Sequence, residues 1–455
     1  MTSNTSLTNE YFQTIESLQG DIQGRRDAFS YMKQSTAIVH EKVVACSFIP
    51  RLFNDKTWQT FKEVSETTHR IVCKVIDNYL NNPDYRDVYS FDDRLKELIL
   101  IPRGYDSLFP FGRFDVFLNE DTFEIGFCEL NGDGSAGMNE NREITHSIEN
   151  SASFKAFQAK HPLETNSVFE AWVDTFISIY ETYQHKVDNP RFAICDYLER
   201  AVVDEFKIFC NYFKERGFDC VICDVRDLSF DGEVLRNKEG QEINAIWRRS
   251  VTNDVIEFWD ESQDFISAVK AEKVALIGSF AGHLVHDKQI FDVLRHPKTQ
   301  AFLTEEEIEF VERHVPKTLF LDDKQVDLEE IRTHKDSWII KPTDAYGAKD
   351  VYAGKSFTSE EWNTLIDTFA NSAAGEPFIV QTYITPYKTL TLPPDTLIET
   401  LSDDEINTEG LMYNNLSGLY VFDGVFAGVF SRLGPLPTIS KEHKGITSAT
   451  LHVFE

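Results

Sequence analysis

The chain has 455 residues, of which 42% are hydrophobic and 26% charged, and it carries 75 acidic against 45 basic side chains. This length and composition are typical of a globular protein with two or three domains, and they exclude a largely disordered chain. The formal net charge of −30 argues against nucleic acid as a partner, because phosphate backbones are met by Lys and Arg. Such acidity favours cationic partners or simply keeps the protein soluble.

Signals for membrane insertion or export are not found in the sequence. No stretch reaches the roughly 18 apolar residues of a membrane span, and no basic segment precedes an apolar one near residue 1. The seven cysteines are an odd number and do not suggest a disulfide framework. Cys220 and Cys223 have metal or redox spacing, but the apolar run CVICDV favours a buried strand. We expect a cytoplasmic protein with no membrane partner.

The first hundred residues are predicted to be mainly helical. Residues 1–9, MTSNTSLTN, are polar without apolar periodicity and predict a loose terminus. Over residues 57–80, TWQTFKEVSETTHRIVCKVIDNYL, apolar side chains recur at three- and four-residue spacing, as in an amphipathic helix. The helical pattern is then broken by Pro102, Gly104, Pro110 and Gly112.

Residues 112–131, GRFDVFLNEDTFEIGFCELN, predict two strands around a turn at residues 119–121. Alternation along a strand places Arg113 with Asp115 on one face, and it does the same for Glu129 and Asn131. Mg²⁺ prefers oxygen ligands and is usually held by one or two carboxylates together with the phosphates of a substrate. The hairpin therefore suits Mg²⁺ and a polyphosphate.

A βαβ unit is predicted next. Residues 191–197 form an apolar strand, residues 201–217 an amphipathic helix that ends in glycine, and residues 219–225 a second strand.

Residues 232–249 predict a hairpin with Gly240 near its turn. The hairpin ends in Arg248 and Arg249. Two interpretations of this pair remain open, namely a solvated strand end and a contact with a phosphate or carboxylate.

The last third of the chain is predicted to begin with charged helices over residues 300–335. Strand, loop and strand follow in DSWIIKPTDAYGAKDVYAG, then a helix over 359–371, a strand over 377–384 and a β-rich stretch from Leu416 onward.

Lys341 lies near the end of a predicted apolar strand, and a loop that contains Gly347 and Ala348 follows. Small residues let backbone N–H groups approach phosphate oxygens, and the lysine adds a point charge. Taken alone, the same pattern also fits a β-hairpin with a surface lysine.

The strand FIVQTYI can present backbone groups at Gln381, Tyr383 and Ile384 to an adenine edge, although alone it fits a buried strand equally well. The order of a strand with a lysine, a glycine loop, a helix and a second strand is that of a lid that clamps ATP.

Several segments together resemble the synthetase part of the glutathionylspermidine synthase family. The R-x-D and E-x-N-x-D motifs of that family match Arg113-Phe-Asp115 and Glu129-Leu-Asn131-Gly-Asp133. The resemblance continues through HDKQIFDVLRHP with Lys288, SWIIKP with Lys341 and LYVFDGVFAGVFSRLG with Arg432. It extends from about residue 100 to the end.

The resemblance implies an ATP-grasp fold of mixed α+β and α/β class with circularly permuted connectivity, including a βαβ substrate-side domain and a small lid sheet. The expected domains are a helical segment (1–100), a metal-binding part of the ATP-grasp core (101–190), a βαβ domain like those that precede ATP-grasp modules (191–300), an ATP-binding lid (301–400) and a C-terminal return to the core (401–455).

The implied function is that of an ATP-dependent ligase, which joins a carboxylate to an amine through an acyl phosphate and releases ADP and phosphate. The expected partners are a small-molecule carboxylate, such as an amino acid or peptide, and an amine. Two alternatives are a small-molecule phosphotransferase of the same fold and a nucleotide-binding protein without turnover. The sequence names neither substrate and gives no oligomeric state.

The resemblance also implies roles for particular residues. Mg²⁺ is expected on Asp115, Glu129 and Asn131. The phosphates of ATP are expected on Lys288 and Lys341 under the Gly347–Ala348 loop, with Gln381, Tyr383 and Ile384 near adenine. The reacting carboxylate is expected near Arg113 and Arg432. Asp133 is either a turn residue or a support for the metal ligands, and the sequence favours packing over catalysis for His283 and His286.

Overall fold

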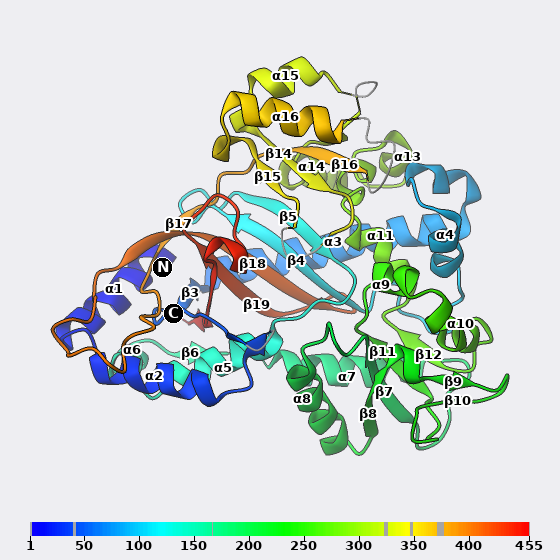
Figure 1. Cartoon of the computed structure of the whole chain (residues 1–455), viewed down its shortest axis with the longest axis horizontal. Coiled ribbons are helices and arrows are strands. Elements are labelled where there is room, and N and C mark those ends of the chain that lie inside the picture. The colour runs from blue at the N-terminus through cyan, green and yellow to red at the C-terminus, as the bar shows by residue number, and fades with distance from the viewer. Residues whose placement is uncertain are drawn as a thin grey trace.

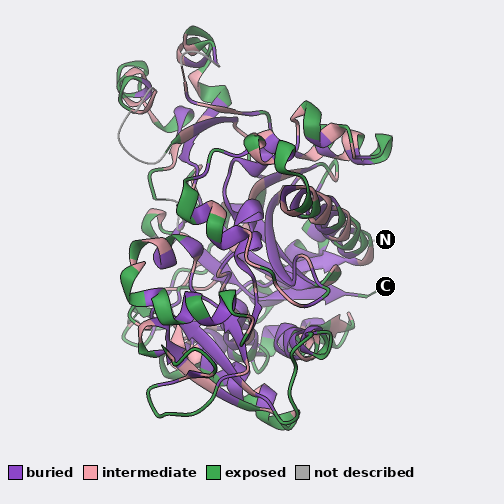
Figure 2. Cartoon of the chain, turned by 90° about the vertical axis from the view of Figure 1, so that its right-hand side faces the viewer, coloured by how far each residue is buried: buried purple, intermediate pink, exposed green. Residues whose placement is uncertain are grey.

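A computed structural model of the protein describes residues 2–39, 42–165, 167–322, 326–345, 349–370 and 377–454. Within these ranges the fold is a mixed α/β arrangement of several sheets, with two four-stranded sheets on either side of a six-stranded central sheet (Figure 1). Strands of the sheets are mostly buried, and helices expose their outer sides (Figure 2). No helix in the described ranges has the length and apolar character needed to cross a membrane.

The central sheet has six strands and is antiparallel, in the order β20-β19-β18-β4-β5, with β17 also paired to β18. It contains the predicted hairpin, which is confirmed. Its strands are β4 (Phe111–Leu118), β5 (Ile125–Asn131), β17 (Lys388–Thr391), β18 (Leu411–Phe422), β19 (Val425–Gly434) and β20 (Ile446–Ser448).

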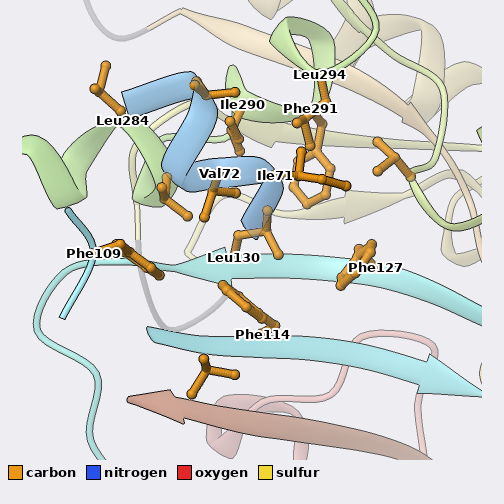
Figure 3. Packing of buried hydrophobic residues seen from close by; sticks show 14 of the residues in the cluster. Ile71, Val72, Phe109, Phe114, Phe127, Leu130, Leu284, Ile290, Phe291 and Leu294 are labelled. Carbon is orange, nitrogen blue, oxygen red and sulfur yellow. The ribbon is translucent and has the colours of Figure 1, made fainter. Parts of the chain in front are cut away.

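One face of this sheet packs on α3 (Asp55–Asn81), the helix that apolar periodicity predicted. Phe114 of β4 and Leu130 of β5 point into this core, where they meet Ile71 and Val72 of α3 (Figure 3). Since side chains alternate along a strand, Arg113, Asp115, Glu129 and Asn131 are left for the opposite face. The same core holds the segment with α11 (His283–His286) and α12 (Ile290–Val293), through Leu284 and Ile290.

A parallel sheet lies to the lower right in Figure 1, in the order β12-β11-β7-β8. Phe192 and Ile194 of β7 pack toward α7 and α8, whereas Ala193 and Cys195 pack toward α10. The predicted βαβ unit is confirmed, and Cys220 and Cys223 lie in the buried strand β8. The bounds are α7 (Val168–Glu181), β7 (Arg191–Asp196), α8 (Val203–Glu215), β8 (Asp219–Asp224), β11 (Ala245–Arg248), α10 (Gln263–Lys270) and β12 (Ala275–Ile277).

The hairpin predicted over residues 232–249 is confirmed around its turn but not at its end. The turn forms at Gly240, where backbone hydrogen bonds join Asn237 to Gln241 and Leu235 to Ile243, with a bridge between Arg236 and Glu242. β11 pairs in parallel with β7 and β12 instead, because its buried apolar residues fit the middle of that sheet. Long-range burial outweighs the local turn here.

A third sheet, called the lid sheet below, has the order β13-β16-β14-β15 and is antiparallel. Ile340 and Val380 pack beneath Trp362 of α16, whose indole donates to the Ile331 carbonyl of α15. The strand, helix and strand predictions are confirmed. The bounds are α14 (Glu305–His314), β13 (Thr318–Phe320), α15 (Leu328–Thr333), β14 (Trp338–Pro342), β15 (Tyr352–Ala353), α16 (Ser359–Phe369) and β16 (Phe378–Thr382).

The loose terminus predicted for residues 1–9 is wrong. Helix α1 (Asn4–Ser17) begins with Ser3 as its N-cap and buries Leu7, Tyr11 and Ile15, which follow one another at four-residue spacing. This stripe starts only at Leu7, so the first nine residues show no periodicity by themselves.

A small sheet joins distant parts of the chain, since β21 (Thr450–Val453) pairs in parallel with β3 (Arg51–Asn54) and antiparallel with β6 (Leu163–Glu164). The other elements are α2 (Ile22–Gln34), β1 (Ile38–Val39), β2 (Lys42–Val43), α4 (Asp93–Ile99), α5 (Met138–Ile148), α6 (Ala152–Gln158), β9 (Ser229–Phe230), β10 (Leu235–Arg236), α9 (Thr252–Glu257) and α13 (Pro297–Gln300).

Candidate active site

The β4–β5 hairpin places the predicted metal ligands opposite one another. Arg113 pairs with Asn131 and Asp115 with Glu129, and the register shifts just beyond, between Asp115 and Val116. Directly opposed side chains in an antiparallel pair lie about 4.5–5.5 Å apart at Cβ. The pairing therefore brings two carboxylates and an amide onto one patch of the sheet.

Asp115 is held by two arginines. Arg113 Nε donates to Asp115 Oδ1 over 2.8 Å and Arg113 Nη2 to Oδ2 over 3.2 Å, while Arg432 Nη2 approaches Oδ2 to 2.5 Å from β19. Burial would lower the pKa of Arg113, but the Asp115 carboxylate raises it above the usual value. Arg113 also donates to the Ala136 carbonyl, so each of its three nitrogens is engaged.

Gly418 leaves the space in which Asp115 and its two arginines meet. The sequence motifs do not identify this residue. It lies on β18 between β4 and β19, opposite Asp115. A Cβ atom at this position would lie 2.8 Å from Asp115 Oδ1 and 2.9 Å from Arg113 Cδ. The missing side chain lets Arg432 reach Asp115 across the intervening strand. A strand glycine is itself a signal of close approach by another group.

Glu129 faces a group of cations. Burial would raise its pKa, but Lys288, whose Nζ lies 3.3 Å from Glu129 Oε1, and the more distant Arg432 and Lys341 help to lower it to about 2. Lys288 Nζ also donates to the Ala345 carbonyl over 2.8 Å. The segment with Lys288 resembles a lysine-bearing helix of the glutathionylspermidine synthase family, but Lys288 itself does not lie on a helix. It lies between α11 and α12, because the helical hydrogen bonds stop after His286.

Lys341 belongs to the lid sheet and points away from its helices. Its Nζ donates to the Gln381 side chain over 2.8 Å and to the Cys128 carbonyl of β5 over 3.1 Å. Burial is the main reason why its pKa is lowered. Lys341 thus joins the lid sheet to the central sheet, and it is buried.

A pocket between the lid sheet and the central sheet gathers many of the predicted residues, and is called the inter-sheet pocket below. Its polar walls include Glu129, Lys288, Lys341, Gln381 and Arg432, and its less polar walls include Phe127, Ile339, Tyr383, Ile384 and Ile439. The lining does not include Arg113, Asp115 or Asn131, although Asp115 contacts Arg432 and pairs with Glu129, which both line the pocket. Gly347 and Ala348 lie outside the described residues.

The backbone of β16 and of Tyr383, the residue after it, offers less to an adenine edge than expected. The N–H of Tyr383 already donates to the Ser337 carbonyl over 2.8 Å. Gln381 pairs on both sides within the sheet, with Thr318 and Ile339. A purine in the pocket would therefore depend on groups other than the Tyr383 N–H.

Arg248 and Arg249 are not a solvated strand end, since both are buried. Each contacts a carboxylate of the protein, as the second interpretation expects. Arg248 pairs with Asp133 over 2.6 Å and Arg249 with Glu205 over 3.1 Å. Asp133 also accepts from the N–H and the hydroxyl of Thr252. Burial would raise the Asp133 pKa, but Arg248 holds it well below the usual range.

The residues of this region fit Mg²⁺ bound to a polyphosphate. Asp115, Glu129 and Asn131 supply oxygen donors, and the Asn131 amide nitrogen is buried with no hydrogen-bond partner among the described residues. Four cations, Arg113, Lys288, Lys341 and Arg432, surround the two carboxylates. The resulting excess of positive charge suits a polyanion.

Comparison with known proteins gives a likeness in fold. No family model matches the chain, and no curated protein matches its sequence. The structure resembles a glutathione synthetase-like effector from Globodera pallida, in its apo form, with a TM-score of 0.62 at 11% identity, covering 94% of this chain and 96% of that one. A putative γ-glutamylcysteine synthetase from Methylobacillus flagellatus has a TM-score of 0.40 at 10% identity, covering 83% of this chain and 87% of that one. The chain therefore shares the fold of a glutathione synthetase-like protein.

Proposed function

We propose that the chain is an ATP-dependent carboxylate–amine ligase of the ATP-grasp type, with circularly permuted connectivity. The observation that carries the proposal is the inter-sheet pocket, where two buried lysines from different parts of the chain, Lys288 and Lys341, meet Glu129 and Arg432. The likeness in fold to a glutathione synthetase-like effector agrees with this class of reaction.

The inter-sheet pocket has a charged wall and a less polar wall, which suit the phosphates and the purine of ATP. The lysines and Arg432 line one part, where they would bind phosphate oxygens through charge-assisted hydrogen bonds. Ile339, Tyr383 and Ile384 line the less polar part, which would hold the purine. Adenosine and its phosphates would thus lie between the lid sheet and the central sheet.

In the proposed reaction, a carboxylate oxygen of one substrate attacks the γ-phosphorus of ATP, and ADP leaves. An amine then attacks the acyl phosphate, loses a proton and displaces phosphate to form the amide. The protein supplies alignment and charge more than covalent chemistry.

Arg432 is the arginine that we assign to the transferring phosphoryl group, because it lines the pocket and Arg113 does not. Arg113 is a positioning residue, which fixes the Asp115 carboxylate from below. Lys288 and Lys341 bind phosphate oxygens. Mg²⁺ would be held by Glu129, Asp115 and Asn131, and it would neutralise phosphate charge there.

The test is a screen for ADP release with ATP and Mg²⁺ over amino acids, peptides and amines, followed by mass measurement of the product. We expect ADP release that requires both a carboxylate and an amine, and a product with the mass of their amide. Lys341→Met should abolish turnover, whereas Lys270→Met, on the exposed side of α10, should not.

Two results would overturn the proposal. A phosphorylated acceptor without an amide would indicate a phosphotransferase. Measurable ATP binding without ADP release across the whole screen would indicate a nucleotide-binding protein without turnover.

A further inference from the structure

Beside the inter-sheet pocket, three buried or nearly buried side chains come together that the proposed ligase reaction does not use. His283 begins α11, Asp287 follows that helix, and Asp344 follows β14 of the lid sheet. One donor atom from each of the three lies within 4.8 Å of the others. The exposed fraction of the side chain is 1% for His283, 4% for Asp287 and 11% for Asp344.

His283 is the unusual member of this group. Both of its ring nitrogens are buried and make no hydrogen bond to any described residue. Nε2 lies 3.6 Å from Asp344 Oδ2 and 4.0 Å from Asp287 Oδ2, distances too long for hydrogen bonds. Buried polar groups normally have a partner, so an imidazole placed in this way points to a ligand between it and the carboxylates.

The spacing suits a metal ion. With metal–ligand bonds of about 2.0–2.2 Å, two ligands of a tetrahedral ion lie about 3.4 Å apart. The two separations measured from His283 Nε2 are slightly longer than this. Small side-chain movements would therefore bring all three donors to one ion.

The other ring nitrogen of His283, Nδ1, faces the carboxylate of Asp133. Nδ1 lies 3.7 Å from Asp133 Oδ2, and Asp133 is itself fixed by Arg248 and Thr252. A histidine that binds a metal usually donates its second N–H to a carboxylate, which orients the ring. Asp133 is placed for this second contact and leaves Nε2 for the metal.

The backbone fixes the approach of α11 to β5. A Cβ atom on Gly282 would lie 2.4 Å from the Gly132 carbonyl oxygen, and one on Gly132 would lie 2.4 Å from the Gly282 carbonyl oxygen. Only glycine at both positions permits this crossing, which sets His283 beside Asp133.

We propose that His283, Asp287 and Asp344 bind a divalent first-row transition-metal ion, in a site separate from the Mg²⁺ site at Asp115, Glu129 and Asn131. An imidazole with two carboxylates favours such an ion over Mg²⁺, which prefers oxygen ligands alone. The ion joins the loop after β14 to α11, and so ties the lid sheet to the segment that carries Lys288. This inference does not depend on the ligase reaction.

The test uses the full chain, stripped of metal with a chelator that is then removed, and titrated with Zn²⁺ in excess Mg²⁺. We expect one equivalent of Zn²⁺ to bind by calorimetry, and Co²⁺ to give the visible absorption of a site with nitrogen and oxygen ligands. Asp344→Asn, in a loop, should weaken Zn²⁺ binding at least tenfold, and His283→Gln should do the same. Asp350→Asn, at an exposed position before β15, should not.

The variants also separate this site from the proposed nucleotide site. Glu129→Gln should retain Zn²⁺ binding even if it loses turnover. Failure of the natively folded wild-type chain to bind Zn²⁺ or Co²⁺ would overturn the inference and leave a protonated histidine between carboxylates. Binding that survives both Asp344→Asn and His283→Gln would overturn it as well.

Discussion

Arg113 and Arg432 approach the same carboxylate, that of Asp115, from different strands, but they differ in exposure. The Arg113 side chain is 11% exposed and the Arg432 side chain 28% exposed. Arg113 makes its contacts within the protein, whereas Arg432 also borders the inter-sheet pocket. We therefore expect loss of Arg432 to reduce turnover and loss of Arg113 to reduce stability.

Arg432→Ala should lower kcat by about 10²–10³-fold, because it removes a preorganised charge at the reacting group. Its free energy of unfolding should change little, since Arg113 still neutralises Asp115. Steady-state ADP release and denaturant titration measure the two effects. Turnover close to that of the wild type would remove Arg432 from the mechanism.

Arg113→Ala should instead lower the free energy of unfolding by about 3 kcal/mol or more, because it removes a buried ion-pair partner. Arg113→Lys should recover part of that loss but not the two-point contact with Asp115. Denaturant titration of both variants tests this. A fully stable Arg113→Ala protein would contradict the positioning role.

Gly418→Ala should destabilise the protein by about 1–3 kcal/mol and reduce turnover, because the new methyl group would overlap Asp115 and the Arg113 stem. Ser417→Ala, the preceding residue of β18, is the control, because it adds no atom to the strand. Thermal unfolding and ADP release should separate the two variants. Equal behaviour would mean that the strand moves to accept a side chain.

At the scale of elements, local patterns predicted much of the fold. The 112–131 hairpin, the βαβ unit and the lid strands were found because their turns and periodicity lie within short windows. The hairpin prediction is wrong for β11 because its partners in the parallel sheet, β7 and β12, lie far away in the sequence. The contribution of Gly418, and the meeting of His283 with Asp344, depend on similarly distant contacts, so the motifs predicted only part of the candidate site.

Helix α1 offers a direct test of its own packing. Asn4 donates to the Thr57 hydroxyl over 2.9 Å and accepts from the Asn54 N–H over 3.0 Å, and so fixes α1 to the start of α3. Asn4→Ala should cost about 1–3 kcal/mol of unfolding free energy, because it leaves buried groups without partners. Asn9→Ala, on the exposed side of α1, should change it by less than about 0.5 kcal/mol. Equal losses in the two variants would contradict this packing.

The carboxyl end of β7 should make stability depend on pH. Burial raises the pKa of Asp196 to about 7, although Arg249 opposes this. Between about pH 4 and 7 the native state then holds a proton that the unfolded state has released, so this group stabilises the fold less as pH rises. An asparagine at this position does not titrate, so Asp196→Asn does not lose this stabilisation as pH rises. The free energy of unfolding of Asp196→Asn minus that of the wild type should therefore increase from pH 5 to pH 8.

Denaturant titrations at several pH values measure this difference. Asp188→Asn, at an exposed position before β7, is the control and should follow the wild type throughout. Parallel curves for Asp196→Asn and wild type would show that Asp196 titrates alike in both states.

At the scale of the whole molecule, the lid sheet and the central sheet meet at the inter-sheet pocket, and the parallel sheet lies apart from it (Figure 1). ATP with Mg²⁺ should therefore slow amide hydrogen exchange in β14 and β16, since a bound ligand stabilises the state that it binds. Exchange in β7 and β8 should not change and serves as an internal control. Protection confined to the parallel sheet would place the nucleotide elsewhere.

The pairing of β18 with β4 also bears on synthesis. The β4–β5 hairpin leaves the ribosome early, whereas its neighbour β18 and the strand β21 that pairs with β3 come from the last part of the chain. At about 5–20 residues per second, the edge of β4 waits on the order of tens of seconds for its partner. An unpaired strand edge can pair with other chains. Production of soluble protein should therefore depend on chaperones more strongly than the stability of the finished fold would indicate, and slower translation should increase aggregation.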